Sequence, residues 1–153
     1  MRLDWAILAN AAEVRENLVN VLSAGWNITY REQYPALFFG AIAARILLHP
    51  SELLSEHNVQ VQVSNAQGNV IHTPVGIRVP AGVAPPGAYL PMTEVPITVA
   101  INLTGLPVPV AGGYFVNLLA DGFHLKSIPI EFVQGGPPAA SSAILGLQGP
   151  GGS

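Results

Sequence analysis

The chain has 153 residues, of which 50% are hydrophobic and 10% are charged, with a net charge of −3 and no cysteine. Because a soluble domain typically has about 25% charged residues, much of this surface must be neutral or apolar, as is typical of a surface that contacts another protein. The composition excludes disulfides, thiolate zinc sites and cysteine nucleophiles, and the few scattered cations provide no basic track for nucleic acid.

The N-terminal third predicts neither export nor a membrane anchor. Residues 1–8 hold one arginine and one aspartate before an apolar run that is too short for a signal peptide, so we expect a cytoplasmic protein. The most apolar stretch, residues 36–48, contains Arg45 and is followed by Pro50, well short of the ~20 residues that a membrane helix needs. We therefore expect no membrane span and assign this stretch to a core or an interface.

Residues 10–30 allow two interpretations. The apolar residues between Val14 and Leu22 follow helical spacing, and Asn10 is placed to cap such a helix. The segment from Leu18 to Leu22 also forms a plausible strand, followed by a turn and by a second group of strand formers. The pattern alone leaves both open.

Two segments in the middle of the chain alternate apolar and polar residues, which is the pattern of a strand with one buried face. The first, residues 59–64, runs into a turn at residues 65–69, and residues 70–79 are predicted to return as its antiparallel partner. The second is residues 97–104. It lies in a region, from Pro80 to Pro109, whose seven prolines predict loops and short strands rather than a helix.

Residues 114–120 alternate in the same way and run into Asp121-Gly122, a dipeptide that favours the tight turn of a β-hairpin. On the return strand the apolar phase changes once, which predicts a β-bulge near Lys126-Ser127. Pro129 cannot donate a ladder hydrogen bond, so we expect it at an edge or at an irregular position.

Short strands separated by frequent turns are typical of a β-sandwich. We therefore predict an all-β, immunoglobulin-like antiparallel β-sandwich of about eight or nine strands in residues 1–133. Residues 134–153 are rich in glycine and proline and are predicted to form a flexible tail. Its apolar residues Ile144, Leu145 and Leu147 allow a second interpretation, a tethered peptide that docks on a partner.

Several segments that together cover most of residues 4–133 resemble a known family. They are Trp5 to Val14, Leu18 to Trp26, the hairpin around Asn65-Ala66-Gln67-Gly68, Leu106 to Pro109, Gly113-Tyr114 and Asp121-Gly122. In these segments the chain resembles an uncharacterised bacterial family of short β-sandwich proteins, a domain of unknown function. The resemblance implies a fold and no activity.

The resemblance also bears on the ambiguous first third. With a β-sandwich implied, we expect a strand from Leu18 and confine any helix to residues Asn10 to Glu16. Members of the family favour a turn-like pair near Glu16-Asn17 and an acidic residue where this chain has Asn10. The departure at Asn10 argues against a charged site there.

The densest cluster of polar side chains is residues 49–57, with His49, Glu52, Glu56 and His57. If part of this segment forms a helical turn, the two glutamates share one face and a histidine completes a divalent-metal site, which would suit a domain that binds a small ligand or hydrolyses one. The alternative, which we favour, is a solvated connection capped by Ser51, without a metal.

No other pattern predicts catalysis. The two aspartates lie near the N-terminus and in a turn, no serine stands in a Gly-x-Ser-x-Gly motif, and no glycine-rich phosphate loop opens a helix. We therefore expect a protein that is not an enzyme and that binds no cofactor.

Apolar residues also occupy strand faces that should be wet. A two-layer sandwich buries one face of each sheet, so the opposite faces need cover from a loop, from a helix of the first third or from another subunit. We predict a homo-oligomer or a complex with a protein partner; a structural subunit of a phage-like or shell assembly is a further alternative. The expected anchors of the interface are Phe39, Leu47, Phe115 and Leu119.

Overall fold

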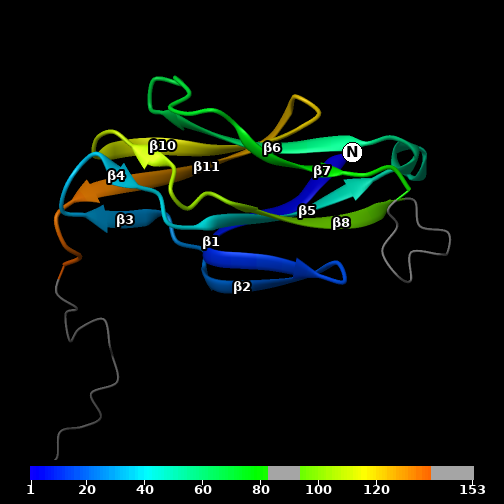
Figure 1. The fold of residues 1–153 in the computed structure, drawn as a ribbon, viewed down its shortest axis with the longest axis horizontal. Coiled ribbons are helices and arrows are strands. Elements are labelled where there is room, and N and C mark those ends of the chain that lie inside the picture. Colours follow the sequence, from blue (N-terminus) through cyan, green and yellow to red (C-terminus); the bar gives the residue numbers. More distant parts are fainter. Residues whose placement is uncertain (83–93, 139–153) are drawn as a thin grey trace, which may run out of the picture.

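The structure is a computed structural model that describes residues 1–82 and 94–138 (Figure 1). The first sheet has the order β2-β1-β5-β8, with β1 (Arg2–Arg15), β2 (Leu18–Ala24), β5 (Ala41–Leu48) and β8 (Val95–Asn102). The second sheet has the order β3-β11-β10-β6-β7, with β3 (Ile28–Arg31), β6 (His57–Asn65), β7 (Val75–Val79), β10 (Gly112–Ala120) and β11 (Phe123–Gln134). A short pair joins β4 (Ala36–Leu37) to β9 (Pro107–Val108), and η1 (Pro50–Leu54) is a turn of 3-10 helix.

This arrangement confirms the predicted all-β class, and the layered sheets are sandwich-like. The two main sheets hold four and five strands, in agreement with the predicted number. The immunoglobulin-like topology stays a prediction. No helix in residues 1–82 or 94–138 is long and apolar enough to cross a bilayer. The proposed docking residues of the tail, Ile144, Leu145 and Leu147, lie outside the described residues.

The core lies between the two sheets and is built from the residues that alternate inward along β6, β8 and β10. The sequence predicted this phase correctly in all three strands, because large apolar residues occupy alternate positions along each. The buried residues include Val59, Val61 and Val63 of β6, Ile97, Val99 and Ile101 of β8, and Tyr114, Val116 and Leu118 of β10.

Four aromatic rings form a continuous chain through the core. Trp26 packs against Phe38 with ring centroids 6.0 Å apart, and Phe38 packs against Phe132 at 5.8 Å. Tyr114 meets Phe132 edge-on at 5.5 Å and donates its hydroxyl to the carbonyl oxygen of Val110 at 2.7 Å. The chain of rings therefore packs the residues just before β3 and just after β4 against β10 and β11. The tyrosine hydroxyl has its hydrogen-bond partner.

The hairpin of β10 and β11 turns at Asp121 and Gly122, whose φ values of 50° and 82° confirm the predicted tight turn. The register shifts once, so that Leu118 lies opposite Lys126 while Leu119 lies opposite His124. The extra residue is Leu125, next to the position that the sequence predicted for the bulge. Pro129 lies opposite Phe115 of β10. On its other side β3 begins only opposite Glu131, so no strand there needs the amide hydrogen that proline lacks.

The first third contains no helix, so the helix allowed for residues Asn10 to Glu16 is wrong. β1 continues through this segment, and Glu16 and Asn17 form a two-residue turn with φ values of 51° and 60°. The strand predicted from Leu18 is confirmed as β2.

The hairpin of β1 and β2 folds back across the first sheet. Through β5, Ala9 lies level with Asn102 at the end of β8, whereas Asn17 at the hairpin tip bonds to Pro96 and Thr98 near the start of β8. Both β1 and β2 contact β8, although β5 lies between them in the sheet order. In Figure 1 the hairpin lies beside β5 and β8, on the side away from β6 and β10.

Small side chains line the face that the hairpin covers. Ala41 and Ala43 of β5 belong to the outward phase and are nevertheless buried, and Ala100 of β8 lies beside Ala43. Methyl groups leave room for a close approach, which larger side chains on this face would prevent. On β5, the cover that the sequence assigned to a loop, a helix or a subunit therefore comes from the protein's own N-terminal hairpin.

Candidate functional site

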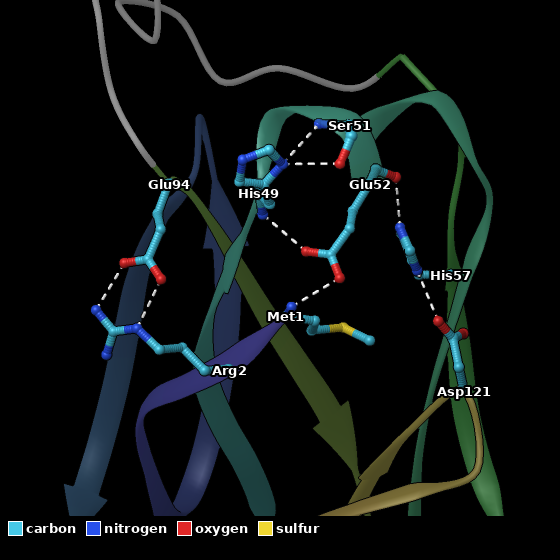
Figure 2. A network of polar contacts seen from close by, with 8 residues as sticks. All are labelled: Met1, Arg2, His49, Ser51, Glu52, His57, Glu94 and Asp121. Carbon is cyan, nitrogen blue, oxygen red and sulfur yellow. Dashed lines mark hydrogen bonds and ion pairs between the residues drawn. The ribbon is translucent and has the colours of Figure 1, made fainter.

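Polar contacts join η1, the start of β6 and the β10–β11 turn at one end of the molecule (Figure 2). His57 is buried there, with Nδ1 2.7 Å from Asp121 Oδ2 and Nε2 2.6 Å from the carbonyl oxygen of Glu52. Both partners are acceptors, so each ring nitrogen carries a proton and the ring is an imidazolium. In this state His57 has no free nitrogen with which to accept a proton or to bind a metal.

His57 and Asp121 each stabilise the charged form of the other. The hydrogen bond with Asp121 raises the pKa of His57 above its ordinary value of 6.5, although burial opposes the shift. Burial acts to raise the pKa of Asp121, but hydrogen bonds from His57 and from the Asn58 amide outweigh it, and this pKa lies below its ordinary value of 3.8. The pair is therefore a structural link between the turn and β6.

We expect the pair to make stability depend on pH. Between pH 3.8 and 6.5, the ordinary pKa values of Asp121 and His57, its stabilisation is fully present, because Asp121 is ionised and His57 is protonated in the folded and the unfolded chain. It is lost as the pH rises through the raised pKa of His57, and also as the pH falls through the lowered pKa of Asp121. His57→Gln should therefore lower the free energy of unfolding by about 1–2 kcal/mol at mildly acidic pH and flatten the profile above pH 6.5. Urea unfolding at a series of pH values measures both, and an unchanged profile in the variant would contradict the assignment.

The other members of the predicted metal group have different partners. The Glu52 carboxylate accepts hydrogen bonds from the Met1 ammonium and from the His49 amide, each at 2.7 Å. The first of these lowers the pKa of Glu52, against partial burial. The Nδ1 atom of His49 lies 2.7 Å from Ser51 Oγ and caps η1, so the cap predicted at Ser51 is His49 instead.

Glu56 points away from this network. It is exposed, and its Oε1 lies 3.9 Å from Arg78 Nε. Across residues 1–82 and 94–138, no three His, Asp or Glu side chains are grouped so that they could hold a metal ion. Figure 2 also shows Arg2 and Glu94, which form a two-bonded surface pair at 2.6 and 2.7 Å. Residues 49–57 thus connect β5 to β6, and the contacts of Glu52 and His57 hold this connection in place.

The edge strands of the two sheets differ in how well they are protected against pairing with another strand. At the free edge of β8, the Asn17 side-chain amide donates to the carbonyl oxygen of Pro96 at 3.0 Å and accepts from the Thr98 amide at 2.7 Å. One side chain thus occupies two of the backbone groups that another strand would use.

The two edges of the second sheet are also protected. β7 lies between Pro74 and Pro80 and carries the exposed Arg78, and prolines and charges at an edge discourage strand addition. β3 has four residues and ends at Arg31, so it is too short to template a long strand.

β2 has none of these protections. Its seven residues include no charge and no proline, and in the described part of the chain no strand pairs with its outer edge. Leu18 and Leu22 are 69% and 64% exposed, and Val21 is exposed as well. An exposed, uncharged, aliphatic edge strand is a template for pairing with another chain.

The four predicted interface residues have unequal exposure. Phe39 is 56% exposed and Phe115 is 38% exposed, whereas Leu47 and Leu119 are half-buried. The outer face of β10 is also less apolar than the sequence suggested. Between Phe115 and Leu119, the Asn117 amide donates to Ser64 Oγ at 2.9 Å and accepts from Ser127 Oγ at 2.6 Å.

A surface hollow lies between the ends of β2 and β3. It is lined by Ala24, Ile28, Arg31 and Phe39, among others. The guanidinium of Arg31 lies 5.2 Å from the centre of the Phe39 ring, which is a cation–π contact, and it also donates to the carbonyl oxygen of Tyr30. The exposed apolar surface of β2 therefore continues into this hollow.

Sequence reasoning did not predict that the apolar residues of β2, and Ile28 of β3, would be exposed. It identified β2 as a strand but not as an edge, because strand order depends on contacts between distant segments. One signal was present: Leu18-Val19-Asn20-Val21-Leu22 has no charge on either face, which is unusual for a strand that is not buried.

Comparison with known proteins gives one result. The model of the family of unknown function DUF6941 matches residues 4–133. No curated protein and no solved structure matches the chain. The resemblance to a family of unknown function is confirmed, and the bacterial origin stays a prediction.

Proposed function

The chain belongs to DUF6941, a family of unknown function, so its role has to be inferred from its own surface, and we propose that it is a non-enzymatic interaction protein. It joins an assembly by offering the outer edge of β2 to another protein chain. The free edge of β2, uncharged and aliphatic, is the observation that carries this proposal.

Strand addition suits this surface for two reasons. The unpaired amides and carbonyls of an edge strand give backbone hydrogen bonds to any partner strand, and the aliphatic side chains give burial. Leu18 and Leu22 are the main anchors, with Phe39 from the adjacent hollow as a third. Phe115 lies on β10 in the other sheet and is not part of this contact, and Leu47 and Leu119 have little surface left to bury.

The polar end of the molecule gives less support to the alternative of a metal-binding or hydrolytic domain, because the contacts of His57 and Glu52 are already made within the chain. The proposal keeps the cytoplasm as the expected location, which suits a chain without cysteine, since such a chain needs no oxidising compartment.

The absence of cysteine also permits a clean test. We expect a Leu22→Cys variant to be alkylated much more slowly inside cells that contain the natural partners than after purification and dilution. Leu54→Cys is the matched control, because Leu54 is 82% exposed on η1 and should react quickly in both settings. Mass spectrometry measures the modified fraction, and equal reactivity of the Leu22→Cys thiol in cells and in dilute solution would sink the proposal.

A further inference from the structure

We propose that the partner of β2 is the β2 strand of a second copy, paired antiparallel about a two-fold axis at Asn20. This rests on the proposed function, since it names the occupant of the same edge. Three features of the described residues carry it: the order of residues in β2, the direction of its free backbone groups and the location of the nearest charges.

The sequence of β2 reads the same in both directions about Asn20, as Leu-Val-Asn-Val-Leu. In an antiparallel pair with its own copy, Leu18 therefore lies opposite Leu22 of the second copy, Val19 lies opposite Val21, and Asn20 lies opposite itself. Every aliphatic side chain meets an aliphatic side chain, and the two central amides can exchange hydrogen bonds.

Other registers lack this match. Centring the pair one residue later, on Val21, places Asn20 opposite Leu22 and Leu18 opposite Ala24. An amide then faces an aliphatic group on each side of the axis, and one leucine loses its partner. Register is strongly specified where side chains differ along a strand, and here the specification selects Asn20 as the centre.

The backbone supports the same centre. β1 and β2 are joined by a two-residue turn, with Arg15 opposite Leu18 as the pair that closes it. Antiparallel pairs alternate, so Leu18, Asn20 and Leu22 direct their amides and carbonyls toward β1, whereas Val19 and Val21 direct theirs outward. In the register centred on Asn20, Val19 and Val21 of one copy meet Val21 and Val19 of the other and can form four hydrogen bonds.

No charge opposes the approach of a second copy along β2. The charged side chains beside it are the Glu13–Arg15 pair on β1, 3.3 Å apart, and the exposed Glu16 in the turn, which in the register centred on Asn20 lies opposite Ala24 of the second copy and not opposite another charge. The contact is short, however, and falls at the low end of specific interfaces, so we expect a dimer with a dissociation constant in the micromolar range.

The first test uses charge at the two-fold axis, in full-length purified protein. Asn20→Lys or Asn20→Asp alone places like charges opposite each other and should raise the dissociation constant of the dimer about tenfold. An equimolar mixture of the two variants places opposite charges there and should restore the dimer. Light scattering over a concentration series gives the dissociation constants, and circular dichroism checks that both variants fold.

The second test is a covalent one. Asn20→Cys places two thiols opposite each other at a non-hydrogen-bonded pair, where Cα atoms about 4.5 Å apart are within the range of a disulfide. Mild oxidation should give a covalent dimer, whereas Leu54→Cys should not. A wild-type chain that stays monomeric at about 1 mM, or a dimer that ignores both charged variants, would overturn the proposal. If the Leu22→Cys thiol is still protected in cells, the partner is another protein, and only the second copy is excluded.

Discussion

Phe132→Ala is expected to lower the free energy of unfolding by about 3–5 kcal/mol. Phe132 is 1% exposed and contacts both Phe38 and Tyr114, so its removal breaks the chain of aromatic rings in the middle. The cost combines the lost burial of the ring with the cavity that remains, because strands on both sides prevent the site from collapsing. Urea unfolding followed by tryptophan fluorescence measures the change, since Trp26 belongs to the same group of rings.

Phe123→Ala is the matched control for this experiment. Phe123 lies on the same strand and is 73% exposed, so the same substitution should change the stability by less than about 0.5 kcal/mol. Similar losses for both variants would mean that the aromatic group is not the support that its packing suggests.

Asn17→Gly should detach the N-terminal hairpin from β8 and cost about 2 kcal/mol of stability. Glycine tolerates the positive φ of this position, so the loss isolates the two hydrogen bonds from the Asn17 amide to Pro96 and Thr98. Hydrogen exchange at the Thr98 amide should become much faster, because that amide loses its acceptor.

Glu16→Gly gives the comparison for the hairpin tip. It changes the neighbouring turn position, where φ is also positive, but leaves the Asn17 amide in place. The Thr98 amide should then keep its slow exchange. If both glycine variants accelerate exchange equally, the turn itself, rather than the Asn17 side chain, holds the hairpin.

The parts of the fold that were predictable are those in which neighbouring residues decide the structure. The alternation around Val59 and Val99, the Asp121-Gly122 turn and the nearby bulge each depend on a few adjacent positions. The turn at Glu16-Asn17 was harder, because it contains no glycine and its flanking residues also fit a helix. The cover over Ala43 was not predictable, since it depends on a hairpin that returns across the sheet.

The same distinction applies to the candidate sites. The segment from His49 to His57 looked like a cluster of ligands, but the partner of His57 is Asp121, 64 residues away, and no local pattern indicates that contact. Phe115 and Leu119 of β10 were read correctly as outward, but Asn117 lies between them and bonds to Ser127 of β11, and Phe123, read as inward, is 73% exposed. The unprotected edge of β2 could be seen only once the strand order was known.

The protection of the other edges has a consequence for the size of any assembly. Protein chains that add to one another through two open margins grow into filaments without a defined end. In the described residues, Asn17 occupies part of the edge of β8, while prolines, charge or short length protect β7 and β3, so β2 is the margin most open to growth. If two copies pair through β2, this edge is used up in both, so we expect assembly by this route to stop at two copies.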